Sequence, residues 1–104
     1  MEPIHQAVNA SDSIQIAENS IVSKQIIKKE GANITLFAFA EGEGLTEHTS
    51  PFDAFVHVID GKADISISGV NTTVRTGEYI LMPANIPHAV KAVEDFKMLL
   101  VMVK

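Results

Sequence analysis

The sequence predicts a single all-β domain, built as a closed or nearly closed antiparallel barrel or sandwich. β-Branched and aromatic residues dominate from Ile21 onward, helical periodicity is absent there, and turn signals recur every few residues. Many short strands separated by such turns are typical of barrels and sandwiches, because these architectures cover most of their own edges. At 104 residues the chain has room for one core and no second catalytic domain.

The elements are expected in a simple order along the chain. Residues 1–20 show little pattern and are expected to form a lead-in segment with one short helical turn and a break at residues 11–13. Residues 21–104 are expected to form the barrel, with turns at pairs such as Asp60-Gly61. The expected strands span residues 21–29, 33–40, 54–60, 62–68, 72–75, 78–82, 88–93 and 96–103.

Side-chain alternation divides these strands into two kinds. Apolar and polar residues alternate in residues 62–68, so this strand is expected to face water on one side. Residues 34–40, 54–59 and 98–103 are apolar on both faces. A small barrel has one interior, so these strands need a second cover from the N-terminal segment or another subunit. We therefore expect a homodimer formed by sheet-to-sheet packing.

Composition excludes several classes of function. The net charge of −5 and the scattered basic residues give no surface for nucleic acid or an anionic membrane. No cysteine is present, which excludes disulfides and thiolate chemistry. The N-terminus lacks the pattern of a signal peptide, and the longest apolar run, residues 98–103, is too short to span a bilayer. We expect a cytoplasmic protein without a membrane or nucleic-acid partner.

Two glycine-bounded segments each carry one histidine, and they are the features most indicative of function. His48 lies between Gly44 and Gly61, and His88 ends the segment that begins at Gly77. Two separated strand-turn segments can bring their imidazoles to one pocket, and two histidines at one barrel mouth indicate a functional pair.

The first segment resembles the first cupin motif, G-x5-H-x-H-x(3,4)-E-x6-G. Residues 42–61 read GEGLTEHTSPFDAFVHVIDG, in which His48 and the two terminal glycines fall at motif positions. Ser50 stands at the position of the second histidine and Ala54 at that of the glutamate.

The second segment resembles the second cupin motif, G-x5-P-x-G-x2-H-x3-N. Residues 77–92 read GEYILMPANIPHAVKA, with Pro83 and His88 at motif positions. Asn85 replaces a glycine and Ala92 an asparagine. Asparagine tolerates the left-handed backbone conformation, so Asn85 is expected to preserve the turn.

The resemblance implies an antiparallel double-stranded β-helix, the jelly-roll-like cupin barrel, and a metal bound by three histidines and a glutamate. Two of these four ligands remain, His48 and His88, so a divalent ion (Fe, Mn, Ni or Zn) would depend on this pair, with Ser50 as a weak hydroxyl ligand. His57 is expected to point outward, because Ala54 marks the inward parity of its strand.

The remaining pocket lining is expected to be apolar and suited to a small organic molecule. The motif positions place Ser50 and Ala54 in this pocket. Parity adds Leu45, Val56, Tyr79 or Met82, Val90, Phe96, Met98 and Met102.

Three functions stay open from the sequence. The first is a small-molecule-binding barrel, a sensor or carrier, with or without a divalent metal at His48 and His88. The second is a metal-dependent enzyme of cupin type, an oxygenase or isomerase in which the metal acts as a Lewis acid or dioxygen site. The third is a structural domain whose barrel is filled by side chains. Fold class does not separate them, because one fold hosts many activities.

Overall fold

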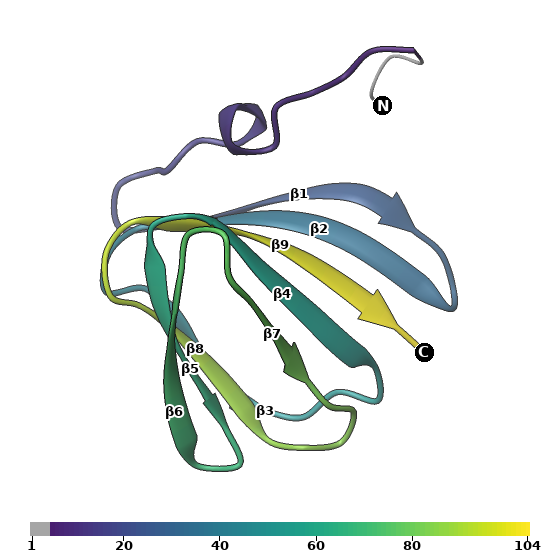
Figure 1. Cartoon of the computed structure of the whole chain (residues 1–104), viewed down its shortest axis with the longest axis vertical. Helices are drawn as coiled ribbons and strands as arrows, with labels where there is room; N and C mark the ends of the chain where they lie inside the picture. The colour runs from purple at the N-terminus through teal and green to yellow at the C-terminus, as the bar shows by residue number, and fades with distance from the viewer. Residues whose placement is uncertain (1–4) are drawn as a thin grey trace.

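The structure is a computed structural model that describes residues 5–104, and it consists of two antiparallel β-sheets packed face to face (Figure 1). The first four residues of the expected lead-in segment lie outside the described range. Within residues 5–104, no helix has the length and apolar character needed to cross a membrane. The elements are η1 (Ser11–Ser13), β1 (Ile21–Lys28), β2 (Ala32–Phe39), β3 (Gly44–His48), β4 (Asp53–Asp60), β5 (Lys62–Ile67), β6 (Val70–Arg75), β7 (Tyr79–Met82), β8 (His88–Ala92) and β9 (Phe96–Val103).

The topology confirms the predicted all-β antiparallel barrel. One sheet has the strand order β1-β2-β9-β4-β7 and the other the order β3-β8-β5-β6. Every neighbouring pair is antiparallel. The last strand, β9, lies in the middle of its sheet, where it pairs with β2 on one side and β4 on the other. Figure 1 shows the two sheets splayed apart at the end where β3 and β7 lie.

One strand is present that the sequence did not predict. β3 is short and exposed, and glycine and polar residues make up much of it, so its sequence resembles a loop. Its pairing with β8 gives it a strand conformation, with a register shift between Leu45 and His48. Gly44 is needed there because a Cβ at this position would overlap the carbonyl oxygen of Val90 on β8. The strand is therefore specified by its partner more than by its own residues.

The main core lies between the inner faces of the two sheets. Its largest fully buried side chains include Phe39, Val56, Ile65 and Phe96. The rings of Phe39 and Phe96 stack with their centroids 4.6 Å apart. Large apolar side chains from both sheets interdigitate here, as expected for a sandwich core.

A second, smaller cluster covers part of the outer face of the five-stranded sheet. Ile14, in the segment before β1, is buried against Leu36 and Ala38 of β2. The Lys97 side chain is buried on the same face, and its Nζ donates a hydrogen bond of 2.6 Å to the Ser11 carbonyl. The N-terminal segment thus supplies one of the two covers that the sequence requires for strands with two apolar faces.

Replacement of Gly61 is predicted to destabilise the turn between β4 and β5. Gly61 has φ +87°, and a Cβ there would overlap the Asp95 carbonyl oxygen. Gly69 has a similar φ of +81° but no atom within 4 Å of a Cβ, so it is a matched control. We expect Gly69→Ala to lose about 1–2 kcal/mol of unfolding free energy from backbone strain. Gly61→Ala should lose a further ~1–3 kcal/mol from overlap.

Urea denaturation of both variants measures this difference. Equal losses for the two alanine variants would show that the neighbouring Asp95–Phe96 backbone moves aside without cost.

Candidate functional site

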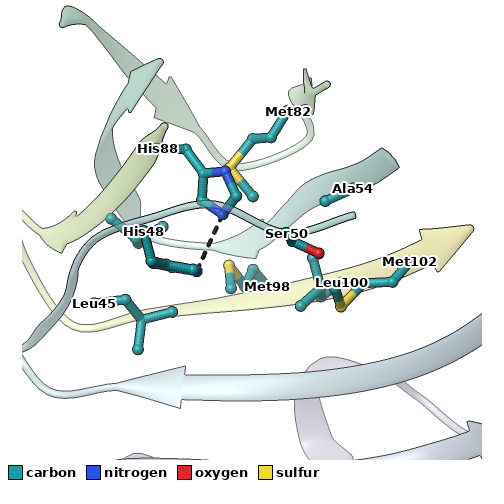
Figure 2. Close-up of a pocket in the computed structure, with 10 residues that line it drawn as sticks. Leu45, His48, Ser50, Ala54, Met82, His88, Met98, Leu100 and Met102 are labelled. Carbon is teal, nitrogen blue, oxygen red and sulfur yellow. Dashed lines mark hydrogen bonds between the residues drawn. The ribbon is translucent and has the colours of Figure 1, made fainter. Parts of the chain in front are cut away.

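A cavity of about 70 Å³ opens between the two sheets and holds both motif histidines (Figure 2). Strands from both sheets contribute to its wall, and its surface is almost entirely apolar apart from the imidazoles and one hydroxyl. The lining residues are Leu45, His48, Ser50, Ala54, Met82, His88, Val90, Met98, Leu100 and Met102.

The two histidines lie opposite each other on adjacent strands. His48 ends β3, His88 begins β8, and their Cα atoms are paired in the ladder. Their Nε2 atoms are 3.1 Å apart, and the rings meet edge to face with centroids separated by 4.4 Å. His88 is buried, with 4% of its surface exposed, whereas His48 is exposed at the rim. The pair therefore spans from solvent to the interior of the cavity.

Backbone carbonyls determine which nitrogen of each ring carries a proton. His48 Nδ1 is 2.7 Å from the Thr46 carbonyl oxygen, and His88 Nδ1 is 3.2 Å from that of Ile86. A carbonyl only accepts hydrogen bonds, so each Nδ1 is the donor, and in the neutral ring Nε2 carries the free lone pair. Both lone pairs are directed toward the same space. The two Nε2 lone pairs therefore require a proton, a cation or a hydrogen-bond donor as their partner.

The position of His88 also affects its protonation. Burial lowers the pKa of His88 below the ordinary value for histidine, and the nearby His48 lowers it further. The hydrogen bond to the Ile86 carbonyl opposes these two effects. At neutral pH the His88 side chain is consequently a neutral electron-pair donor.

Hydrogen bonds join the segment 50–53 to the segment 84–85 at the rim of the cavity. The Asn85 amide donates to the Ser50 carbonyl over 2.7 Å, and the Ala84 amide donates to the Asp53 carboxylate over 2.8 Å. Asn85 has φ 63°, which confirms the left-handed turn expected where the cupin motif has glycine. The Ser50 hydroxyl accepts a hydrogen bond from the Phe52 amide. These contacts fix the approach to both histidines.

The structure brings most of the expected pocket residues together. Ser50, Ala54, Met82, Val90 and Met98 line the cavity beside the two histidines, as do Leu45 and Met102.

Other expected lining residues lie elsewhere. Val56 and Phe96 are fully buried in the main core and do not line the cavity. Of the two alternatives on β7, Met82 lines the cavity, whereas Tyr79 is 64% exposed on the outer face. Val56 has the inward parity of Ala54 but is fully buried in the main core, whereas its ladder partner Leu100 lines the cavity. Alternation identifies inward residues but does not show which of them reach the cavity. Leu100 lines the cavity and was missed, although it shares the inward parity of Met98 and Met102.

His57 lies on the outer face, as alternation predicts. It is half-buried, pairs with Tyr79 across β4 and β7, and its ring centroid is 6.4 Å from that of Phe55. Across residues 5–104, no group of three or more His, Cys, Asp or Glu side chains is arranged to hold a metal ion. The cavity therefore offers two imidazole nitrogens, one hydroxyl and methionine sulfur as its donor atoms.

Comparison with known families and structures agrees with this architecture. Residues 35–104 match the family described as cupin domain. The chain superimposes with a TM-score of 0.95 on a conserved protein of unknown function from Streptococcus pyogenes, at 35% identity over 99% of this chain and 90% of that one. No curated protein matches the chain.

Two further structures are similar to this chain. A cupin 2 conserved barrel domain protein from Leptotrichia buccalis is 41% identical, with a TM-score of 0.88 over 90% of this chain. The match spans only 46% of the Leptotrichia chain, which is thus more than long enough for a second domain of this size. A cupin superfamily protein from Desulfitobacterium hafniense is 25% identical, with a TM-score of 0.92 over 97% of this chain and 93% of that one.

Acidification is predicted to destabilise the fold through His88. Because the pKa of His88 is lowered in the folded state, the unfolded chain binds a proton more readily. The unfolding free energy should therefore be highest above about pH 6.5, the ordinary histidine pKa, and fall as the pH drops below it. Urea denaturation at pH 7.5, 6.5 and 5.5 should show this fall in the wild type and in His57→Gln, and a flatter profile in His88→Gln. Parallel profiles for all three proteins would contradict the assignment.

Proposed function

We propose that this chain, which belongs to the cupin domain family, binds a ligand in the pocket that holds His48 and His88. The function is ligand binding: the chain acts as a sensor or carrier that holds a small ligand at the paired Nε2 atoms. Because one fold hosts both enzymes and binding proteins, the proposal rests on the chemistry of the site.

A single observation carries the proposal, namely the two Nε2 atoms that face each other 3.1 Å apart at an apolar cavity. Two converging acceptors on an apolar surface favour a ligand that brings positive charge or hydrogen-bond donors. The cavity volume of about 70 Å³ is well below the roughly 300–1,000 Å³ of sites for drug-sized ligands. The enclosed part of the ligand is therefore an ion or a small group, and the exposed His48 leaves the mouth open.

For a divalent ion such as Fe, Mn, Ni or Zn, this chain keeps only two of the four cupin ligands. Two nitrogens bound to one ion at about 2.0–2.1 Å lie roughly 2.9–3.4 Å apart for bond angles from 90° to tetrahedral, and the observed 3.1 Å falls in this range. Ser50 and Ala54, however, replace the other two ligands of the motif. When bound, such an ion would supply Lewis acidity, and this chain would hold it through His48, His88 and the Ser50 hydroxyl.

A metal-dependent enzyme, an oxygenase or isomerase, is the second candidate. The close histidine pair favours it, because two adjacent ligands on one ion leave positions open for substrate. The pocket lacks the carboxylate that completes the facial site of non-haem iron enzymes. This donor set favours binding over catalysis.

Replacement of either pocket histidine is predicted to weaken ligand binding. We expect His48→Gln and His88→Gln to weaken binding of Zn²⁺, or of fragments found by ligand-observed NMR, by at least about tenfold, the cost of one lost charge-assisted contact. His57→Gln is the matched control, because this histidine lies on the outer face. Elemental analysis of untagged protein purified without chelator gives an independent readout of metal.

A wild type that binds neither metal ions nor fragments would refute the binding function and favour the filled structural barrel. A ligand that all three variants bind equally would place the site elsewhere.

We also propose that the chain forms a homodimer through an outer patch, defined as Phe55, His57, Tyr79, Leu81 and Val101. These outward residues occupy adjacent positions on β7, β4 and β9. The ring centroids of Phe55 and Tyr79 are 5.0 Å apart and stacked, yet Tyr79 is 64% and Leu81 58% exposed. Apolar and aromatic residues of this kind are typical of interface cores.

The partner that fits the outer patch is a second copy of this chain. With a net charge of −5, two copies repel each other except where a patch free of acidic side chains allows close approach. Packing of the same face of two copies about a two-fold axis gives a closed dimer.

Leu81→Glu is predicted to convert the dimer to a monomer of 11.3 kDa. In a two-fold symmetric interface, a buried charge lies near the same charge of the partner subunit and is repelled by it. The dissociation constant of the dimer should therefore increase by at least about tenfold. Val70→Glu on β6 is the control, because Val70 is 68% exposed on the other sheet. Sedimentation velocity would contradict the proposal if the wild type were monomeric at about 100 µM, or if both variants behaved alike.

A further inference from the structure

We propose that the pocket is selective for a soft monovalent metal ion of the copper(I) class, held by His48 Nε2, His88 Nε2 and the thioethers of Met82 and Met98. This inference rests on the proposed binding function and names the class of its ligand. It follows from the donor atoms that surround the histidine pair.

The first argument is the placement of the methionines. The chain has four methionines, and all three beyond Met1 line this one cavity together with both motif histidines. Met82 and Met98 are buried, with 4% and 1% of their surfaces exposed. In Figure 2 their side chains point toward the histidine pair, from β7 and β9 respectively, whereas Met102 lies further along β9 beside Leu100.

The second argument is the softness of these donors. Thioether sulfur is a soft, polarisable ligand that favours Cu(I), whereas Mg²⁺, Ca²⁺ and Mn²⁺ prefer carboxylate, carbonyl and water oxygen. Imidazole serves copper as well as zinc, iron and nickel. The two imidazoles therefore admit many metals, and the sulfur atoms select among them.

The third argument is charge. No carboxylate lines the cavity, and across residues 5–104 no acidic side chain joins the histidine pair to form a metal-holding group. The cost of moving an ion from water into an apolar site rises with the square of its charge, so a divalent ion meets about four times the penalty of a monovalent one. Neutral donor atoms therefore offset this penalty more easily for a monovalent ion than for a divalent one.

The histidine geometry is compatible with this assignment. Both Nδ1 atoms donate to backbone carbonyls, of Thr46 and Ile86, so both Nε2 atoms are available as neutral ligands at once. Backbone partners of this kind fix the ring orientation before an ion arrives.

The test uses Ag⁺ and Cu⁺ as probes on the full untagged chain. With Ag⁺, which needs no reductant, ¹³C-methyl spectra of the methionines should show large shifts for Met82 and Met98 and a smaller one for Met102. Anaerobic competition of Cu⁺ against a colorimetric chelator should give one ion per chain. Met82→Leu and Met98→Leu should each weaken Cu⁺ by at least tenfold and leave Zn²⁺ binding within twofold, while Met102→Leu changes neither.

The leucine variants conserve core volume, and the methyl spectra of the wild type test the same contact without any substitution. Cu⁺ or Ag⁺ binding that depends on the histidines but leaves the methyl signals of Met82 and Met98 unmoved would overturn the inference. Zn²⁺ binding that exceeds Cu⁺ binding would overturn it as well, while leaving the proposed function intact. If no metal ion and no fragment binds, both the copper(I) assignment and the proposed binding function are wrong.

Discussion

The structure depends on one constraint, which is that the central strand β9 carries mostly apolar residues on both faces. Its inward residues, such as Phe96 and Met98, pack against the opposite sheet, and Lys97 is buried on the outer side. Two covers are therefore required, and they come from different sources. The four-stranded sheet covers the inner face, and the N-terminal segment, fastened by the Lys97 hydrogen bond to the Ser11 carbonyl, covers part of the outer one.

The candidate site occupies the part of the sandwich where the sheets separate. Side chains fill the closed end, where Val56 and Phe96 lie, and the open end leaves a small cavity between β9 and the pair of strands that carry the histidines. Glycine at position 44 allows β3 to approach β8 closely enough for the imidazoles to meet. The cupin frame is thus intact in its turns and strand positions, while the donor atoms within it differ from those of the motif.

Much of this arrangement could be predicted from the sequence because it depends on local patterns. Alternation identified the strands with two apolar faces and placed His57 outside the pocket. The preference of asparagine for left-handed backbone explained Asn85. These features rely on residues that are close in the chain, where periodicity and turn chemistry are informative.

Other features depend on contacts between distant residues, and the sequence did not predict them. β3 exists because β8 pairs with it, and its own glycine and polar residues are typical of a loop. The availability of both Nε2 atoms depends on the carbonyls of Thr46 and Ile86, which only the folded loops bring to the rings. The packing of the two sheets likewise decides which inward residues line the cavity, as Ala54 does and Val56 does not.

The position of β9 has a consequence for how the barrel folds. It is the last strand in chain order, yet it joins β2 to β4 in the middle of the five-stranded sheet. Before β9 is added, the β1-β2 hairpin and the antiparallel β4-β7 pair share no hydrogen bonds. Isolated two-stranded pairs are marginally stable in water. Pairing of β9 with β2 joins residues as distant as Ala32 and Val103, and contacts of such long sequence separation slow folding. A nascent chain that stops short of Phe96 contains every strand of the four-stranded sheet but has nothing to join the two parts of the five-stranded one.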